Sequence, residues 1–250
     1  MKNLILAAVV ISCFAACKKS KTEEPTPTPQ IVVVPKIKTT TIGGDLVTST
    51  YDNQGRLLTK ISPVSNWKYE YVYGTNLVTE NYYVGTTLST SKNFELNADG
   101  FITKETYNLP ITSIPFKTLY TYNANKQLQT KVSSNTMNSN GNTETYFYTG
   151  TILDSMRTTF NQNNDLYRFF YTYYTDKLNS FGYKNQGLLF FAETGDNPVK
   201  KQTSIFRTNG FFNTQVDDFT YIFDAQNRIT RRSILTVGSS TPSVNDITYY

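Results

Sequence analysis

A short pattern of residues recurs along the chain at intervals of about 25 residues. It starts with an aromatic residue, a spacer and a second aromatic residue, continues through a polar turn, and ends on an aliphatic residue followed by Thr or Lys. Its copies lie at residues 51–57, 69–77, 94–102, 120–128, 146–152, 171–178, 190–199 and 221–229. Repetition at a fixed period indicates one supersecondary unit used several times.

Within a copy the aromatic residues alternate with polar ones, as Tyr69, Tyr71 and Tyr73 do with Lys68 and Glu70. A period of two is typical of a strand with one buried face and one face in water. The residues that follow, such as Asp-Asn-Gln-Gly at 52–55, are those that form tight turns. No segment carries a long 3.6-residue apolar stripe, so we expect essentially no helix.

These features predict an all-β fold, an antiparallel meander of about eight tandem β-hairpins forming one large curved sheet or a barrel-like, flattened-barrel domain. A closed barrel of sixteen strands has an interior too wide for side chains to fill. We therefore expect either a sheet that flattens on itself or one that stays open and strongly curved.

A barrel that spans a membrane needs an outward apolar band framed by aromatic girdles. The apolar face of this chain is instead dominated by Tyr, which argues against spanning. The final segment, residues 245–250, ends on an aromatic residue and keeps an outer-membrane β-barrel as an alternative.

The N-terminus has the features of an export signal. Lys2 precedes an uncharged stretch, residues 4–16, which is too short to cross a bilayer. The next motif, Phe14-Ala15-Ala16-Cys17, resembles the bacterial lipobox, with Phe14 in place of the usual Leu. The resemblance implies removal of residues 1–16 as a lipoprotein signal peptide and lipidation of Cys17. An ordinary signal cut near Ala16, with Cys17 incidental, is the alternative.

Residues 17–35 form the predicted tether, and residues 36–250 the predicted single all-β repeat domain. The tether contains Pro25-Thr26-Pro27-Thr28-Pro29, which favours an extended spacer. Cys13 would leave with the signal peptide, so the mature chain would keep one of its two Cys residues and form no internal disulfide.

Composition narrows the chemistry that this chain can perform. It contains no His, which removes Ser-His and Cys-His nucleophiles and His-ligated metal sites, so we predict no catalytic residue, no metal and no cofactor. The net charge of +5 is spread over a chain that is 17% charged, and nucleic acid is not an expected partner. Arg228, Arg231 and Arg232 are expected on the solvent side of one strand.

Paired carboxylates keep an alternative open, an enzyme that acts on polysaccharides. The candidates are Glu70, Glu80, Glu95, Glu105, Glu144 and Glu193. Glu70 and Glu105 are expected on the polar face of their strands, and most Asp residues are explained by turns.

Two further residues are candidate sites. Trp67, the only Trp, is expected in the loop after the first repeat, where its ring would be an anchor for a saccharide. Asp154-Ser155-Met156 resembles a three-residue O-glycosylation sequon of Gram-negative envelope proteins, which makes Ser155 a candidate acceptor.

The repeat also resembles a known family. Residues 51–57, Tyr-Asp-Asn-Gln-Gly-Arg-Leu, match the YD-repeat unit, whereas the other copies are degenerate and keep only parts of it, such as Gly100, Arg228 and Phe223-Asp224. With the lipobox, residues 45–250 look like Gram-negative lipoproteins of unknown function that are described as porin-like in fold. The resemblance implies hairpin architecture and a cell-envelope, outer-membrane location that faces either the periplasm or the cell surface.

The leading hypothesis is a non-enzymatic protein anchored to the membrane by its N-terminal lipid. It would serve as a structural or binding module whose partner is a glycan or an envelope protein.

Overall fold

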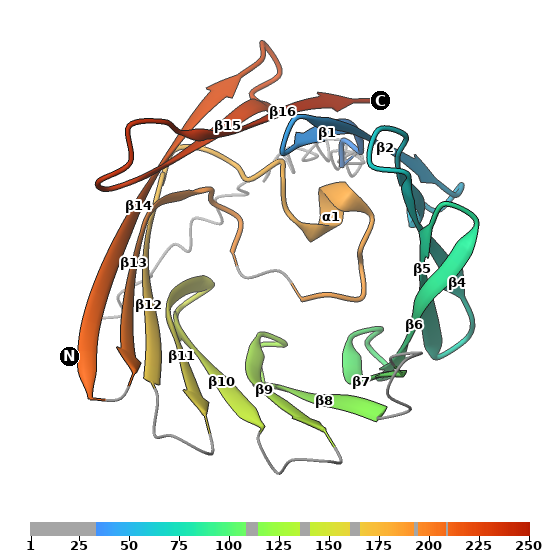
Figure 1. Ribbon diagram of the computed structural model, residues 1–250, viewed down its shortest axis with the longest axis horizontal. Coiled ribbons are helices and arrows are strands. Elements are labelled where there is room, and N and C mark those ends of the chain that lie inside the picture. Colours follow the sequence, from blue (N-terminus) through green and yellow to red (C-terminus); the bar gives the residue numbers. More distant parts are fainter. Residues whose placement is uncertain (1–33, 109–114, 136–140, 161–165, 193–194, 209) are drawn as a thin grey trace, which may run out of the picture. The chain divides into compact units, whose positions relative to one another are not determined.

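The structure is a computed structural model that describes residues 34–108, 115–135, 141–160, 166–192, 195–208 and 210–250. In these residues, sixteen strands form one antiparallel sheet that closes on itself as a barrel (Figure 1). Each strand pairs with its neighbours in the chain, and β1 (Ile37–Ile42) closes the ring by pairing with β16 (Ser243–Tyr249). The predicted all-β antiparallel meander is confirmed, and the sheet closes rather than staying open. Closure leaves no unpaired sheet edge.

The other elements follow in chain order. They are β2 (Asp45–Tyr51), β3 (Leu57–Ser62), β4 (Trp67–Tyr73), β5 (Leu77–Val84), β6 (Thr87–Leu96), β7 (Ile102–Asn108), β8 (Pro115–Tyr122), β9 (Leu128–Asn135), β10 (Asn142–Thr149), β11 (Ile152–Phe160), β12 (Leu166–Tyr173), α1 (Tyr183–Gln186), β13 (Val199–Thr208), β14 (Phe211–Phe223) and β15 (Ile229–Thr236).

The polar turn of the repeat has the same geometry in four units. At Asp52, Oδ1 accepts hydrogen bonds from the main-chain N–H of Gln54 and Arg56, at 2.9 Å each. The same two bonds, to residues two and four places later, are made by Asn97, Asn123 and Asp224. The fourth residue of the first turn, Gly55, has a φ of +73°, a left-handed conformation that favours Gly or Asn.

A second feature of the repeat is a hydrogen bond from Tyr to main chain. The Tyr73 hydroxyl on β4 donates to the carbonyl of Leu57 on β3 at 2.8 Å. Five more pairs share this arrangement, namely Tyr51 to Ile37, Tyr122 to Ile102, Tyr173 to Leu153, Tyr221 to Val199 and Tyr249 to Ile229. The bond requires a phenol, so Tyr and Phe are not equivalent at these positions of the pattern.

The recurring rings face the barrel interior, as the alternation predicted. Tyr71 is 7% exposed and Phe94 is 2% exposed. The aliphatic residue that ends the pattern lies on the same side, because Leu57, Ile102 and Ile229 are each 0% exposed. The inner face of the sheet is therefore the core of the protein.

The outer wall of the barrel is polar. Thr side chains on neighbouring strands bond to each other there, as Thr50 does to Thr59 at 2.7 Å. Outward charges form ion pairs across strands, including Lys104 with Glu95, Arg231 with Asp246 and Lys201 with Asp218. Apolar residues such as Val72, Phe147, Phe170 and Ile222 are exposed between them. The outer face thus mixes charged, hydroxyl and apolar side chains.

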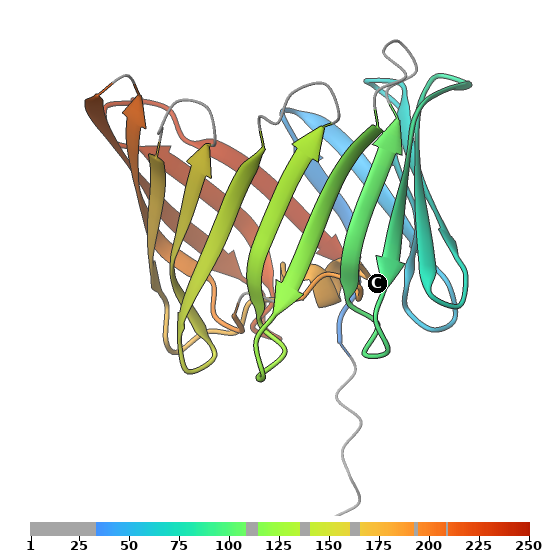
Figure 2. The same ribbon diagram turned by 90° about the horizontal axis from the view of Figure 1, so that it is seen from below.

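The segment between β12 and β13, as described in residues 174–192 and 195–198, folds into the barrel instead of forming a hairpin tip (Figures 1 and 2). We call it the plug. It contains α1, a single helical turn of four residues, so the expectation of no helix is wrong at this place. The repeat copy predicted at residues 190–199 is also wrong as a hairpin, because its rings belong to the plug. The described residues nevertheless form sixteen strands, and β1 pairs with β16 to close the ring.

No helix among the described residues is long and apolar enough to cross a membrane. The predicted signal peptide, residues 1–16, with the lipidation site Cys17 and the tether up to residue 33, lies outside the described residues.

Candidate functional site

Six charged side chains form a band on the inner wall of the barrel, and their sign alternates from one to the next. The inner charged band consists of Lys60, Glu80, Lys92, Glu105, Lys131 and Glu144, on β3, β5, β6, β7, β9 and β10. Lys92 Nζ lies 3.7 Å from Glu80 Oε1 and 3.4 Å from Glu105 Oε1. Lys131 Nζ lies 3.1 Å from Glu144 Oε1. Five of the six charges of the band are therefore compensated by direct ion pairs.

Each carboxylate of the band also accepts a hydrogen bond of 2.7 Å from a phenol. The pairs are Tyr71 to Glu80, Tyr120 to Glu105 and Tyr146 to Glu144. Burial acts to lower the pKa of Lys92, but the carboxylates of Glu105 and Glu80 outweigh it and hold that pKa above its ordinary value. The band is thus a network of ion pairs and charge-assisted hydrogen bonds.

The structure corrects two assignments of polar residues to the solvent side. Glu105 faces the interior, because it pairs with buried Phe94 across the β6–β7 ladder. Arg231 does face outward, but Arg232 faces inward, donates to Asn245 Oδ1 and lies over the Phe181 ring at 4.7 Å. Arg228 lies at a turn, where its guanidinium is 4.8 Å from the Tyr249 ring.

The plug packs against the wall on two sides. Leu188 and Phe190 join the larger buried cluster, whose wall residues are Leu57, Tyr71, Val78, Phe94, Ile102 and Tyr120. Phe181 packs on the smaller cluster of Ile37, Ile229 and Ile247. Lys60 ties the inner charged band to the plug, since its Nζ donates to Gln186 Oε1 at 2.9 Å. Burial lowers the pKa of Lys60, and Glu80 opposes that shift.

The plug also accepts hydrogen bonds from the residue that ends the repeat pattern. The main-chain N–H of Leu57 donates to the carbonyl of Gly187 at 3.0 Å, and that of Ile102 donates to the carbonyl of Phe190 at 3.2 Å. The N–H of Ile229 donates to Ser180 Oγ at 2.7 Å. In all three units the register shifts just after this residue, as it does in the first between Leu57 and Thr59, which pair with Tyr51 and Thr50. Such a bulge leaves a main-chain donor outside the ladder.

The start of the domain contacts the plug as well. Asn185 Nδ2 donates to the carbonyl of Pro35 at 2.9 Å, and Lys36 Nζ donates to the carbonyl of Lys184 at 2.5 Å. Pro35, the last residue of the predicted tether, and Lys36, the first residue of the predicted domain, are therefore bonded to α1.

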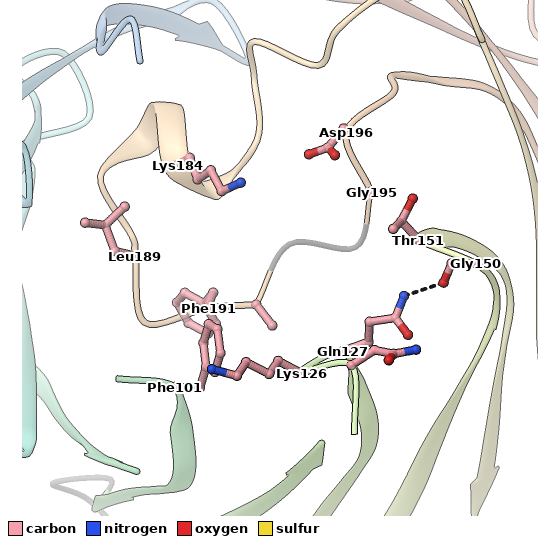
Figure 3. A pocket seen from close by; sticks show the side chains of 12 residues that line it. Phe101, Lys126, Gln127, Gly150, Thr151, Lys184, Leu189, Phe191, Gly195 and Asp196 are labelled. Atoms are coloured by element: carbon pink, nitrogen blue, oxygen red, sulfur yellow. Dashed lines mark hydrogen bonds between the residues drawn. The ribbon is translucent and has the colours of Figure 1, made fainter. Parts of the chain in front are cut away.

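On its remaining side the plug is separated from the wall by two cavities, which together we call the crevice. The inner cavity, of about 250 Å³, is lined by wall residues Tyr120, Tyr122, Leu128, Lys131, Tyr146, Leu153, Tyr171, Tyr173 and Val199 and by plug residues Tyr183, Phe191 and Ala192. The outer cavity, of about 730 Å³, lies between the plug and the turns that contain Phe101, Gln127 and Thr151 (Figure 3). Both cavities include Phe191 and Ala192, so they are adjacent.

The inner cavity offers ring faces together with a few fixed polar groups. Tyr122 and Tyr173 have their hydroxyls bonded to main-chain carbonyls, and burial raises the pKa of Tyr122 to about 12. Burial and the charge of Glu144 raise the pKa of Tyr171 to about 12. These phenols stay protonated at neutral pH, so they present neutral rings and hydroxyl groups. A concave, mostly aromatic pocket with few polar groups is typical of a binding site for small molecules.

The structure places the predicted site residues away from the crevice. Trp67 is the first residue of β4, not a loop residue, and its ring packs edge-on against Tyr69 at 5.4 Å. Ser155 lies within β11 and pairs with Phe147 and Phe170, two exposed outer-wall residues. Neither residue is brought next to the other or to the plug.

The inward lysines were not identified from the sequence, although a signal was present. Lys92 stands two residues before buried Phe94, and this spacing puts both side chains on one face of a strand. Among the described residues, no group of three acidic or Cys side chains could hold a metal ion.

No family model and no curated protein matches this chain. Two solved structures are similar in fold. A porin-like protein from Bacteroides uniformis has a TM-score of 0.61 and 12% identity, over 86% of this chain and 95% of that one. A porin-like protein from Bacteroides vulgatus has a TM-score of 0.60 and 14% identity, over 86% of this chain and 99% of that one. At such identities the likeness shows the fold alone.

Proposed function

We propose that this chain is a non-enzymatic cell-envelope protein, anchored by a lipid on Cys17, whose barrel stands in water and serves as a binding module. An outward charge in the middle of a strand carries this proposal. An Arg or Lys that faces lipid costs about 2 to 4 kcal/mol at the bilayer midplane and about 0 to 1 kcal/mol near the interfaces. Arg157, the sixth of the nine residues of β11, is exposed on the outer wall, 5.9 Å from the Phe147 ring. Lys104, Lys201 and Arg231 also face outward, but each lies near the start of its strand.

Strand length agrees with this proposal for most of the ring. A strand that spans a membrane needs about 9 to 11 residues. The consecutive strands β1 to β5 have six to eight residues each, whereas β6, β11, β13 and β14 have nine to thirteen. The lipobox-like motif would supply the membrane attachment that the outer wall itself does not favour. The likeness to porin-like proteins is consistent with an envelope protein that folds as a barrel.

The competing hypothesis is an enzyme that uses the inward carboxylates. Lys92 lies between Glu80 and Glu105, and each carboxylate already accepts a phenol hydrogen bond. We assign these groups a structural role, because their oxygens are engaged within the wall. An enzyme would instead lose all turnover on Glu105→Gln while it kept its fold.

One experiment separates a tethered barrel from a spanning barrel. The full chain and its Cys17→Ala variant are expressed in a Gram-negative host with radiolabelled palmitate, and membranes are washed at alkaline pH. We expect the wild type to be labelled and retained, and the variant to be unlabelled and released without detergent. Labelling of the variant would refute lipidation at Cys17, and a variant that stays in washed membranes would refute the water-exposed barrel.

A further inference from the structure

Two arginines lie directly opposite each other on the outer wall of the barrel. Arg157 on β11 pairs with Arg168 on β12 in the antiparallel register, and both residues are exposed. Like charges that lie directly opposite each other on neighbouring strands destabilise a sheet. The sheet by itself therefore gains nothing from bringing these two guanidinium groups together.

Elsewhere on the outer wall, a cation lies opposite a carboxylate. Three pairs combine this register with an ion pair, namely Lys104 with Glu95, Lys201 with Asp218 and Arg231 with Asp246. The other partners of Arg157 and Arg168 across the ladders are neutral, Thr145 on β10 and Ile205 on β13. Asp154, the acidic residue of β11, accepts a hydrogen bond from a Thr hydroxyl of β10. The two Arg thus depart from the charge pairing of this wall.

The two Arg border a hollow in the outer wall, which we call the outer hollow. Its volume is about 210 Å³, and its lining residues all lie within β10, β11 and β12: Phe147, Ser155, Met156, Arg157, Arg168 and Phe170. Ser155 lies between two rings, because it pairs with Phe147 on one side and with Phe170 on the other. The two Phe residues are 43% and 42% exposed. The outer hollow thus combines two guanidinium groups, two ring faces and one hydroxyl.

We propose that the outer hollow binds one acidic sugar unit of a polysaccharide. This inference deepens the proposed binding role and rests on it, because the outer hollow is open to a sugar only where the outer wall stands in water. Arg presents a planar fork of N–H donors that matches the two oxygens of a carboxylate. Two Arg together hold one carboxylate, and its negative charge removes the repulsion between their own charges.

The other lining groups favour a sugar acid over a simple anion. Exposed aromatic rings gain from covering their apolar faces, and the C–H face of a pyranose packs on such rings. The Ser155 hydroxyl both donates and accepts, so it suits a sugar hydroxyl. Arg157 already lies over the Phe147 ring, 5.9 Å from its centre, so that charge and ring act at one place.

The size of the outer hollow limits how much of a ligand it holds. Its volume lies below the range of about 300 to 1,000 Å³ that is typical of pockets for whole ligands. It also opens on the outside of the sheet, so a long chain can pass across it without entering the barrel. These two features suit one unit of a polymer.

The test uses the full chain, purified in a detergent that carries neither charge nor sugar groups. Titration calorimetry at low ionic strength, about 20 mM, compares a linear trimer of galacturonate with the linear trimer of galactose. We expect a Kd below about 1 mM for the acidic trimer and binding at least tenfold weaker for the neutral one. Because salt screens exposed charges, the Kd of the acidic trimer should rise at least threefold in about 0.5 M NaCl.

Two variants and a matched control locate the site. Arg157→Gln and Phe170→Ala should each weaken binding of the acidic trimer at least fivefold. Arg231→Gln also removes one exposed Arg of the outer wall, but that Arg is paired with Asp246 away from the outer hollow, so the Kd should change less than twofold. The melting temperature of Arg157→Gln should be unchanged or raised, because the variant relieves the repulsion between the two Arg. A loss of affinity in that variant is then separate from a loss of fold.

Several results would overturn the proposal. They are equal binding of the two trimers, an unchanged Kd in Arg157→Gln, and a melting temperature that falls further in Arg157→Gln than in Arg231→Gln. Inorganic phosphate or phosphatidylglycerol vesicles that compete as strongly as the acidic trimer would also overturn it, as would a glycan found on Ser155 by mass spectrometry. If the acidic trimer does not bind while the Cys17→Ala chain is released from washed membranes, the site fails and the proposed location stands.

Discussion

The hydroxyl of Tyr73 and the carbonyl of Leu57 form a 2.8 Å hydrogen bond between neighbouring strands, directly behind a hairpin turn. Arg56 of that turn lies over the Tyr73 ring at 4.4 Å, and its Nε bonds Asp52 Oδ2 at 2.6 Å. Asp52 in turn holds the turn's main chain. These residues of the repeat pattern are thus one connected unit, in which the aromatic residue, the acidic residue and the Arg stabilise the same end of the hairpin.

Removing a Tyr hydroxyl should lower the free energy of unfolding only where that hydroxyl forms a hydrogen bond. Tyr73→Phe loses the bond to Leu57 and should lower the free energy of unfolding by about 1 kcal/mol. Tyr148 is the matched control, because its hydroxyl is buried and has no hydrogen-bond partner in the described part of the chain. Tyr148→Phe should leave the stability unchanged or raise it.

Urea unfolding followed by Trp67 fluorescence measures both variants against the wild type. Equal losses in the two variants would show that the hydroxyl acts through general packing rather than through the carbonyl bond.

The approach of the plug to the wall depends on Gly187. Its φ is +71°, and a Cβ there would lie 2.7 Å from the main-chain N of Leu57 and 2.8 Å from the carbonyl O of Gly55. Gly187→Ala should therefore push the plug away from β3, with loss of the bond between Leu57 and Gly187. We expect faster hydrogen exchange in residues 180–192 and a loss of stability above the roughly 1 kcal/mol that the left-handed backbone alone accounts for.

Gly100→Ala is the control for backbone strain. Gly100 also has positive φ, +83°, but no atom lies within 4 Å of the added Cβ. Should the two variants lose the same stability and leave plug exchange unchanged, the close contact at Gly187 would have no energetic role.

The sequence predicted the strands, the turns and the inward rings, because alternation and turn chemistry are local. Closure was not predictable, since it depends on the pairing of β1 with β16 across the whole chain. Phe190 was placed in a hairpin because an aromatic residue near a polar turn gives the same sequence pattern in a hairpin and in the plug. Glu105 was misplaced for a local reason: the register shift between Glu95 and Leu96 changes the face of every later residue on β7.

The crevice could not be predicted from the repeat for a related reason. Its wall consists of ordinary repeat residues such as Tyr122 and Leu128, and what distinguishes them is the position of the plug beside them. That information resides in the tertiary position of residues 174–198, and the pattern of the strands does not contain it.

The inner charged band should be sensitive to removal of one cation. Lys92→Met leaves Glu80 and Glu105, each largely buried, without their ammonium partner, and should cost about 1 to 3 kcal/mol at pH 7. Lys104→Met removes an outer-wall partner of Glu95 and should cost about 0 to 1 kcal/mol. The raised pKa of Lys92 means that the wild type keeps this stabilisation below pH 10.5 and loses it as pH rises through the folded-state pKa.

Unfolding midpoints of Lys92→Met and Lys104→Met at pH 7 test the band. A deficit no larger than that of Lys104→Met would mean that the inward pairs contribute no more than surface pairs do.

The carboxylates of Asp52 and Asp224 should make the stability of the folded protein fall at acid pH. Hydrogen bonds from the main chain and side chain of Arg56, which outweigh burial, hold the pKa of Asp52 below its usual 3.8, and Arg228 does the same for the pKa of Asp224. A lowered folded-state pKa adds stability above pH 3.8, and this stability is lost as pH falls through the folded-state value.

The double variant Asp52→Asn/Asp224→Asn tests this role of charge. It keeps a side-chain oxygen like the one that Asn97 uses in its own turn, but it loses the negative charge. Its melting temperature should be lower than that of the wild type by a constant amount from pH 7 to about pH 5, and the two should converge below pH 3.8. A difference that persists undiminished at pH 2 would show that the carboxylate charge has no part in holding these turns.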